Sequence, residues 1–147
     1  MFSYYLIIIL IVVIAVSIHY EMLNWLSLKV PALTIRNRAR VLLALIGAIV
    51  AHVVEIWLFA IAYYFIIYYE KMGALEGNFD GSLNDCFYFS ITTYTTVGYG
   101  DIVPLGEVRF LAGLESLLGL VLITWTASFL FIEMQKFWLK GNSSKKP

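Results

Sequence analysis

The 147-residue sequence has few charged residues, a single cysteine and no net charge. Asp, Glu, Lys and Arg make up 14% of the residues, which is too little polar surface for a soluble domain of this length. The ten basic residues balance the ten acidic ones, so the charge indicates no nucleic-acid partner. Cys86 is the single cysteine, which excludes a disulfide within the chain.

The sequence also lacks the patterns that accompany catalysis. No metal-ligand spacing, nucleophile constellation or phosphate-binding loop occurs in it. The triplet Gly98-Tyr99-Gly100 does not lie between a strand and a helix, as a nucleotide-binding motif would. We therefore expect neither an enzyme nor an organic cofactor.

Hydrophobic residues are abundant, at 61% of the total, and they form three long runs. Residues 1–20, 41–69 and 106–138 are each apolar and long enough to cross a bilayer as a helix. A cleaved signal peptide is the alternative for the first run, but no Lys or Arg precedes it and no clear cleavage site follows it. We expect an integral, multi-pass, all-α membrane protein in contact with membrane lipids.

The charges between these runs predict an orientation. Residues 21–40 form a basic linker, cytoplasmic or lying on the membrane surface, and its cations are Lys29, Arg36, Arg38 and Arg40. Residues 70–81 form a loop with three acids and one lysine, whereas residues 139–147 form a tail that contains Lys140, Lys145 and Lys146. Because short loops rich in Lys and Arg stay in the cytoplasm, we expect an external N-terminus and a cytoplasmic C-terminus in the cytoplasmic (plasma) membrane.

A segment too short to cross the bilayer lies between the second and third runs. Ser82 followed by Asp85 matches a capping box, and residues 82–94 continue as a mainly apolar stretch of about a dozen residues, which predicts a re-entrant helix. It leads into residues 95–101, Thr-Thr-Val-Gly-Tyr-Gly-Asp, whose glycines make a poor helix interior. Non-helical backbone at membrane depth is tolerated only where protein encloses it or where it lines a water-filled path. Residues 95–101 are therefore the first candidate site.

A membrane helix, a re-entrant helix, the motif T-T-V-G-Y-G-D and a further membrane helix together resemble the potassium-channel pore domain. The resemblance covers residues 41–138, so the chain looks like a small prokaryotic potassium channel with an added N-terminal helix. It implies a homotetramer, because one chain provides one pore segment and a closed ring of carbonyls needs several. It also implies passive, potassium-selective conduction with K⁺ ions in the filter. A weakly selective monovalent cation channel is one alternative, and a non-conducting membrane scaffold or regulatory subunit is another.

The resemblance assigns roles to the filter segment, residues 95–101. It implies that the selectivity filter consists of Thr96, Val97, Gly98, Tyr99 and Gly100. The backbone carbonyls of residues 96–99 and the hydroxyl of Thr96 would coordinate K⁺. Thr95 would lie at the cavity-facing base, and Asp101 would lie at the external mouth, where carboxylates attract cations. The C-terminal end of the re-entrant helix would face the cavity, where its partial negative charge favours a cation.

Four residues outside the filter segment are expected to support it: Tyr88, Phe89, Thr92 and Glu115. Tyr88 and Phe89 occupy positions that are often tryptophan in the family, and Tyr88 keeps a hydroxyl for which Asp101 is the expected partner. Thr92 stands where some prokaryotic members have a glutamate, so the carboxyl pair formed there behind the filter is absent.

Polar residues and glycine within the apolar runs form further candidates. His52 and Glu55 share one helix face, and counting along the helices places Glu55 and Glu115 in the outer half of the bilayer. One interpretation is a pH-sensitive cluster of His52, Glu55 and Glu115 behind the filter; the other is neutral, hydrogen-bonded carboxyls that hold helices together. Gly119 is a candidate gating hinge, with close helix packing as the alternative.

Overall fold

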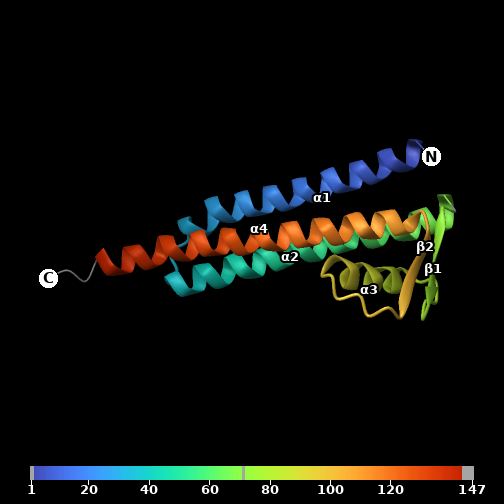
Figure 1. Ribbon diagram of the computed structural model, residues 1–147. Coiled ribbons are helices and arrows are strands. Elements are labelled where there is room, and N and C mark those ends of the chain that lie inside the picture. Colours follow the sequence, from blue (N-terminus) through green and yellow to red (C-terminus); the bar gives the residue numbers. More distant parts are fainter. Residues whose placement is uncertain (1, 71, 144–147) are drawn as a thin grey trace.

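The computed structural model describes residues 2–70 and 72–143, and Lys145 and Lys146 of the predicted tail lie outside the described residues. Three long helices run side by side, and a short helix lies beside one end of them (Figure 1). The long helices are α1 (Phe2–Lys29), α2 (Asn37–Phe65) and α4 (Val108–Ser143), and the short one is α3 (Leu83–Tyr94). Each long helix contains an apolar stretch long enough to cross a membrane, so the predicted fold class is confirmed.

Helix α1 continues well past the predicted end of the first run. It ends at Lys29 and is followed by a 3₁₀ turn (Val30–Ala32) that contains Pro31, so residues 21–29 of the predicted linker are helical instead. This extension packs on α2, because Leu26 lies against Ala48 in a small buried cluster. The chain has no helix breaker before Pro31, and the apolar contact with α2 stabilises the extra turns.

The other helix boundaries differ by a few residues from the prediction. Helix α2 begins at Asn37 rather than residue 41 and continues into a π-helical turn (Ile66–Glu70). Helix α4 begins at Val108 rather than residue 106, and it extends beyond residue 138 to Ser143. Most of the extra residues are polar or basic, and hydropathy alone does not assign such residues to a spanning helix.

A two-stranded antiparallel sheet, absent from the prediction, brackets α3 and the filter segment. Strand β1 (Gly73–Gly77) lies within the predicted external loop, and strand β2 (Ile102–Gly106) follows the filter segment. Gly73 pairs with Gly106 at one end of the sheet, and Gly77 pairs with Ile102 at the other. Neither strand shows the apolar–polar alternation that predicts a strand.

Helix α3 begins at the predicted capping box. The Oγ atom of Ser82 accepts a hydrogen bond from the backbone N–H of Asp85 at 3.1 Å, which is the expected N-cap. Asp80 accepts from the backbone N–H of Ser82 at 2.7 Å, and hydrogen bonds from Ser82 hold the pKa of the Asp80 carboxyl below its ordinary value. This closed turn sets where α3 starts, and the length of the helix then sets where the filter segment begins.

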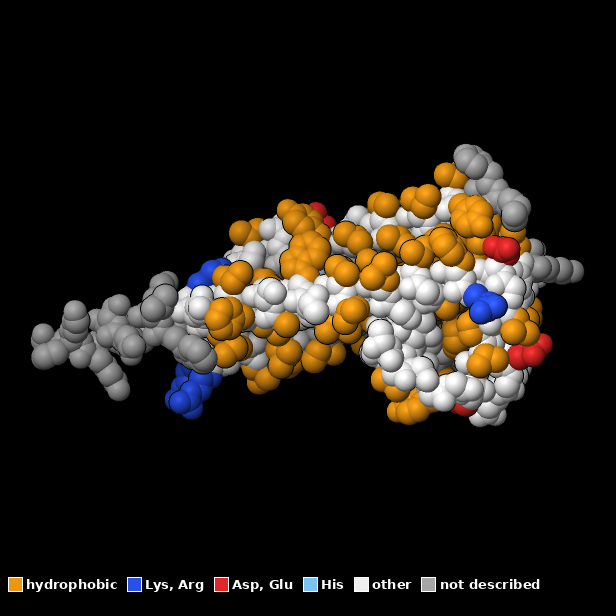
Figure 2. All heavy atoms as spheres, viewed as in Figure 1, with side chains coloured by type: hydrophobic (Ala, Val, Ile, Leu, Met, Phe, Trp, Pro, Cys, Tyr) orange, Lys and Arg blue, Asp and Glu red, His pale blue; other side chains and the backbone are white. Residues whose placement is uncertain are grey.

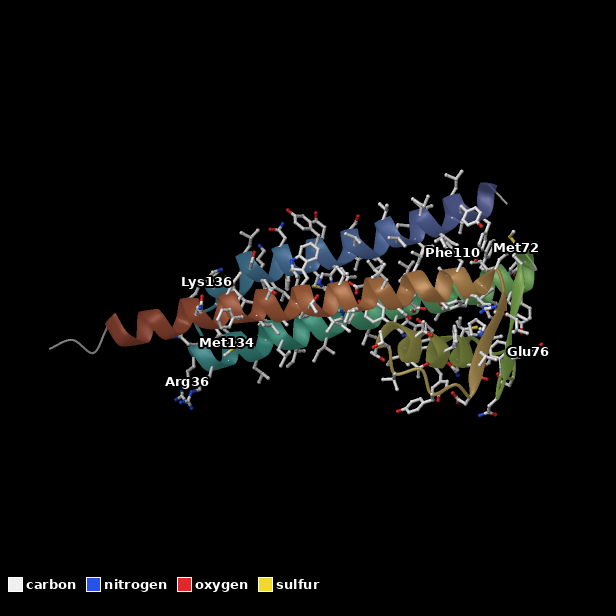
Figure 3. The ribbon with its side chains drawn as sticks, in the orientation of Figure 1. Arg36, Met72, Glu76, Phe110, Met134 and Lys136 are labelled. Atoms are coloured by element: carbon white, nitrogen blue, oxygen red, sulfur yellow. The ribbon has the colours of Figure 1, made fainter. Side chains whose placement is uncertain are left out.

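Apolar side chains cover much of the sides of the bundle, and charged side chains gather near its ends (Figure 2). Arg36 and Lys136 lie near one end, and Glu76 lies near the other (Figure 3). Exposed apolar residues occur on every long helix, among them Leu10 of α1, Ile49 of α2 and Leu120 of α4. Apolar exposure of this extent suits contact with lipid or with neighbouring subunits.

Candidate functional site

The filter segment leaves the C-terminal end of α3 and leads to β2. The sign of φ alternates along its backbone. Thr96, Gly98 and Gly100 have positive φ values of 60°, 50° and 79°, whereas Val97 and Tyr99 between them have negative φ. This alternation lets successive carbonyls of a nearly extended backbone face one side, whereas the carbonyls of a regular strand point alternately to opposite sides. Thr96 is the one non-glycine residue with positive φ among those described, at a cost of about 1–2 kcal/mol. No feature of the sequence indicated this conformation, because a β-branched residue such as threonine rarely adopts positive φ.

Hydrogen bonds to the last turn of α3 hold the base of the filter segment. The N–H of Thr96 donates to the carbonyl of Thr93, and the N–H of Gly98 donates to the carbonyl of Thr92, each at 3.0 Å. The hydroxyl of Thr95 donates to a carbonyl one turn earlier in α3 at 2.6 Å. The backbone of the segment is thus tied to the end of the re-entrant helix, at the position expected for the base of a filter.

The other end of the segment is held by Asp101. The hydroxyl of Tyr88 donates to the carboxylate of Asp101 at 2.9 Å, the partner expected from the sequence, and the carbonyl of Asp101 accepts from Asn78 at 2.8 Å. The side chains of Val97 and Tyr99 are 53% and 73% exposed in the single chain. The filter segment is therefore held by hydrogen bonds at both ends, and its two large side chains point away from the core of its own chain.

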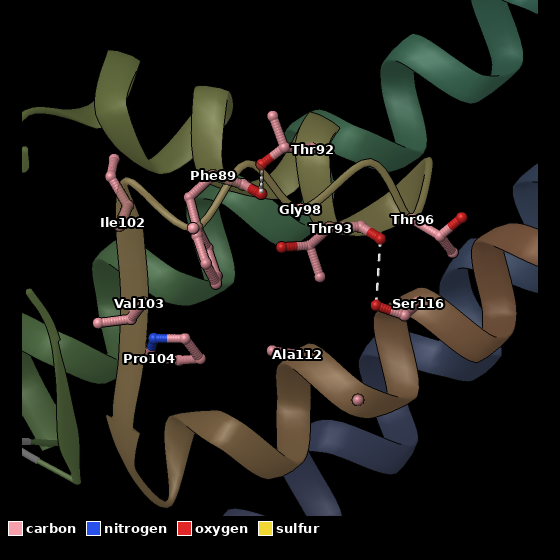
Figure 4. Close-up of a pocket in the computed structure, with 12 residues that line it drawn as sticks. Phe89, Thr92, Thr93, Thr96, Gly98, Ile102, Val103, Pro104, Ala112 and Ser116 are labelled. Atoms are coloured by element: carbon pink, nitrogen blue, oxygen red, sulfur yellow. Dashed lines mark hydrogen bonds between the residues drawn. The ribbon is translucent and has the colours of Figure 1, made fainter. Parts of the chain in front are cut away.

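Phe89 and Thr92 support the filter segment less directly. Phe89 is buried and packs edge-to-face on Tyr63 of α2, with ring centroids 5.0 Å apart. The hydroxyl of Thr92 donates to the carbonyl of Phe89 at 3.0 Å (Figure 4). Across the described part of the chain, neither side chain hydrogen-bonds to Tyr99 or Asp101.

A hollow of about 400 Å³ lies between the filter segment, β2 and the first turns of α4 (Figure 4). Thr93, Thr96 and Gly98 line it on one side, and Ala112, Gly113 and Ser116 line it on the other. The hydroxyl of Ser116 donates to the carbonyl of Thr93 at 3.1 Å, which joins α4 to the end of α3. The hollow leaves the flank of the filter segment uncovered by its own chain.

Glu115 of α4 is fully buried and joins three helices. Its carboxylate oxygens accept from the hydroxyl of Tyr63 in α2 and from the hydroxyl of Ser90 in α3, each at 2.5 Å. The Ser90 hydroxyl also lies 2.9 Å from the carbonyl of Ile56. This geometry favours a helix-holding role for Glu115 over a part in a pH-sensitive cluster.

Glu55 belongs to a separate network, so the structure does not bring His52, Glu55 and Glu115 into the single cluster that one of the two interpretations predicted. His19 Nδ1 lies 2.9 Å from one oxygen of Glu55, and His52 Nδ1 lies 3.3 Å from the other. The hydroxyl of Tyr94, at the end of α3, donates to Glu55 as well. The two carboxylates contact α3 at different places. Glu115 accepts from Ser90 in the middle of the helix, and Glu55 accepts from Tyr94, its last residue.

Sequence reasoning missed His19, Tyr94 and Thr126 as members of this network. The Oγ1 atom of Thr126 lies 3.0 Å from His52 Nε2 and 3.3 Å from His19 Nε2. The network joins residues from four different helices, so no local spacing relates all five: His19 of α1, His52 and Glu55 of α2, Tyr94 of α3 and Thr126 of α4. One signal was present: an imidazole in the first apolar run needs a buried partner if that run crosses a membrane.

Gly119 of α4 lies against the end of α3. A Cβ added at Gly119 would lie 2.1 Å from the carbonyl oxygen of Tyr94, well inside contact distance. By contrast, a Cβ added at Gly113 would meet nothing within 4 Å. Close packing therefore accounts for glycine at position 119, and the gating hinge stays a prediction.

Known proteins resemble the part of the chain that carries this geometry. Residues 51–136 match the profile of a family described as "Ion channel". "Potassium channel protein kcv" of Paramecium bursaria Chlorella virus 1 is 43% identical over 56 residues, which are 33% of this chain and 60% of that protein. "Inward rectifier potassium channel Kirbac3.1" of Paramagnetospirillum magnetotacticum is 36% identical over 58 residues, which are 39% of this chain and 20% of that protein. The chain thus spans less than two thirds of either relative, and no solved structure matches it.

Proposed function

Because the chain belongs to the ion channel family that it matches over residues 51–136, we propose that it is a membrane channel through which potassium ions pass passively. The observation that carries this proposal is the filter segment, where positive φ values at residues 96, 98 and 100 follow the end of a short helix. Two relatives described as potassium channels support potassium as the ion. As a member of a channel family, the protein is not an enzyme.

The ion would be held by oxygen atoms of the filter segment alone. Carbonyls of residues 96–99 and the hydroxyl of Thr96 would replace the hydration shell of K⁺. Thr95 would mark the base of the filter, and the carboxylate of Asp101 would attract cations at its mouth. The C-terminal end of α3 directs its partial negative charge toward the base, which favours a cation there.

The proposed assembly is a homotetramer in a membrane. One chain provides one filter segment, and a ring of carbonyls around an ion requires several copies with closed symmetry. The exposed side chains of Val97 and Tyr99 are surfaces that neighbouring copies would bury. Cations at the α1–α2 connection, where Arg36 lies, favour a cytoplasmic C-terminus and an external N-terminus in the plasma membrane.

A flux assay with two matched glycine variants tests the proposal. Purified protein is reconstituted into liposomes, and K⁺ and Na⁺ fluxes are measured for the wild type, Gly98→Ala and Gly113→Ala. A Cβ would meet nothing within 4 Å at either glycine in the single chain, but only Gly98 has positive φ. We expect Gly98→Ala to lower K⁺ flux at least tenfold, because alanine strains that backbone, and Gly113→Ala to leave the flux near that of the wild type.

The outcomes separate the three candidate functions. Flux of K⁺ without Na⁺ supports the proposal, and comparable flux of both ions supports a weakly selective cation channel. No flux of either ion, from protein shown to be assembled by size-exclusion chromatography, would point to a scaffold or regulatory subunit instead.

A further inference from the structure

The side chains of His19, His52, Glu55, Tyr94 and Thr126, here called the His–Glu network, bring together a set of metal-ligand atoms inside the bundle. One ligand atom from each of His19, His52 and Glu55 lies within 4.8 Å of the other two. His19 and Glu55 are fully buried, and His52 is 15% exposed. We propose that His19, His52 and Glu55 bind a divalent transition metal ion such as Zn²⁺, a site that potassium conduction does not require.

The two separations between an imidazole nitrogen and a carboxylate oxygen are close to those of tetrahedral coordination. Zinc–ligand bonds of about 2.0–2.1 Å place neighbouring ligand atoms of a tetrahedron about 3.3 Å apart. The Nδ1 atoms of His19 and His52 lie 2.9 Å and 3.3 Å from the two oxygens of Glu55. Two imidazoles and a carboxylate are donors that zinc and its neighbours in the first transition row prefer, whereas Mg²⁺ and Ca²⁺ prefer sites built from oxygen alone.

Tyr94 provides a fourth oxygen beside these three ligands. Its hydroxyl lies 2.9 Å from His52 Nδ1 and donates to Glu55. With an ion at the centre, this hydroxyl can stay hydrogen-bonded to Glu55 or turn toward the metal. The geometry therefore leaves a fourth position for the phenol oxygen or a water molecule, as metal sites with three protein ligands have.

Thr126 lies where it can hold the second ring nitrogen of both histidines. Its Oγ1 atom is within hydrogen-bond distance of Nε2 of His52 and of Nε2 of His19. With a metal on the Nδ1 atoms, the hydrogens lie on Nε2, and Thr126 Oγ1 accepts both. Metal-bound histidines are commonly held by an acceptor of this kind on the other ring nitrogen.

The position of the site says what a bound ion would do. It would join α1, which lies outside the pore-domain pattern, to α2 and to Tyr94, the last residue of α3 before the filter segment. Of the three ligands, His52 is the one that is partly exposed in the single chain. The bound ion would thus give the N-terminal helix a chemical link to the base of the filter.

Metal content of the purified protein is the first test. The full-length chain, made without a histidine tag, is equilibrated with Zn²⁺ in detergent, freed of unbound metal and assayed by elemental analysis. His19 and His52 are the two histidines of the sequence, so the double variant His19→Gln/His52→Gln removes every imidazole. We expect about one Zn²⁺ per chain for the wild type and at least a tenfold loss of affinity for the double variant.

One control variant and one further test variant accompany this measurement. Glu133→Gln changes another buried carboxylate of α4, one that pairs with Lys136, and should leave zinc retention unchanged. Thr126→Val removes the shared acceptor without removing a ligand, and it should weaken zinc binding about 10–100-fold. Circular dichroism and size-exclusion chromatography show that each variant is folded.

Fluorescence quenching locates the ion. The ring of Trp125 lies 5.5 Å from that of His19, so Cu²⁺ in the same site should quench Trp125 strongly. Trp125→Phe should remove most of the quenching and keep the bound metal. No retained Zn²⁺ in the wild type, equal retention in the double histidine variant, or quenching that persists in Trp125→Phe would overturn the proposal. Neither measurement involves ion flux, so its failure is distinct from a failure of the proposed channel function.

Discussion

Glu55 and Glu115 are both fully buried carboxylates on spanning helices, yet their partners differ in kind. Glu115 accepts hydrogen bonds from two hydroxyl groups, those of Tyr63 and Ser90. Glu55 accepts from one hydroxyl and is flanked by two imidazoles. A hydroxyl offers little beyond a hydrogen bond, whereas an imidazole can also bind a metal or a proton. Burial alone therefore does not decide what an intramembrane carboxylate does, because its partners set the chemistry.

The two carboxylates also meet α3 at different places. Glu115 reaches Ser90 in the middle of the helix, and Glu55 reaches Tyr94 at its last residue. Contact with the middle holds the helix against α2 and α4, but contact with the last residue acts where the filter segment begins. The comparison thus separates a contact within the helix from a contact at the start of the filter segment.

Removing each carboxylate gives the largest expected difference. Glu55→Ala leaves two imidazoles and a phenol without their acceptor, and we expect it to lower the free energy of unfolding by about 3–5 kcal/mol. Glu115→Ala should cost about 1–3 kcal/mol, because Ser90 keeps the carbonyl of Ile56 and only Tyr63 loses its partner. Thermal unfolding in detergent, followed by circular dichroism, measures both; equal losses would contradict the distinction between the networks.

Gly119→Ala should have the next largest effect and should act on the Glu55 side alone. The new methyl group would press on the carbonyl of Tyr94, so we expect a loss of about 1–3 kcal/mol and weaker zinc retention. Gly113→Ala is the control, and it should be neutral or slightly stabilising, since its methyl group meets open space in a helix. If zinc retention is unchanged in Gly119→Ala, the backbone of Tyr94 does not influence the His–Glu network.

The smallest effects are expected from the two tyrosines. Tyr63→Phe removes one of two donors to Glu115 and should cost about 1 kcal/mol. Tyr94→Phe should cost less, because Glu55 keeps both imidazoles. The unfolding midpoints of the two variants, measured side by side, test this order, and a larger loss for Tyr94→Phe would show that the phenol holds Glu55 more strongly than the imidazoles do.

The parts of the molecule that depend on neighbours in sequence could be predicted. Ser82 and Asp85 begin α3 as their spacing indicates, and Tyr88, within this short helix, reaches Asp101 at the far end of the filter segment that follows it. The glycines at positions 98 and 100 have the positive φ values expected of a backbone that is neither helix nor strand. Local geometry determined these features, so the sequence was sufficient to find them.

The parts that depend on contacts between distant segments could not be predicted. His19 meets Glu55 only because α1 packs beside α2, and hydropathy says nothing about which faces of two apolar helices meet. Strand β1 forms only because β2 returns beside it, and its sequence lacks strand alternation.

The pairing of β1 with β2 has a consequence for assembly. Because Gly73 lies opposite Gly106, the chain from one strand to the other is a closed loop that contains α3 and the whole filter segment. Closing a loop removes most of the conformations that its free ends would allow, so the filter segment is already constrained within a single chain. In the proposed homotetramer, copies that associate in this state would lose little further chain entropy at the filter segment, and the sheet would favour a well-ordered ring.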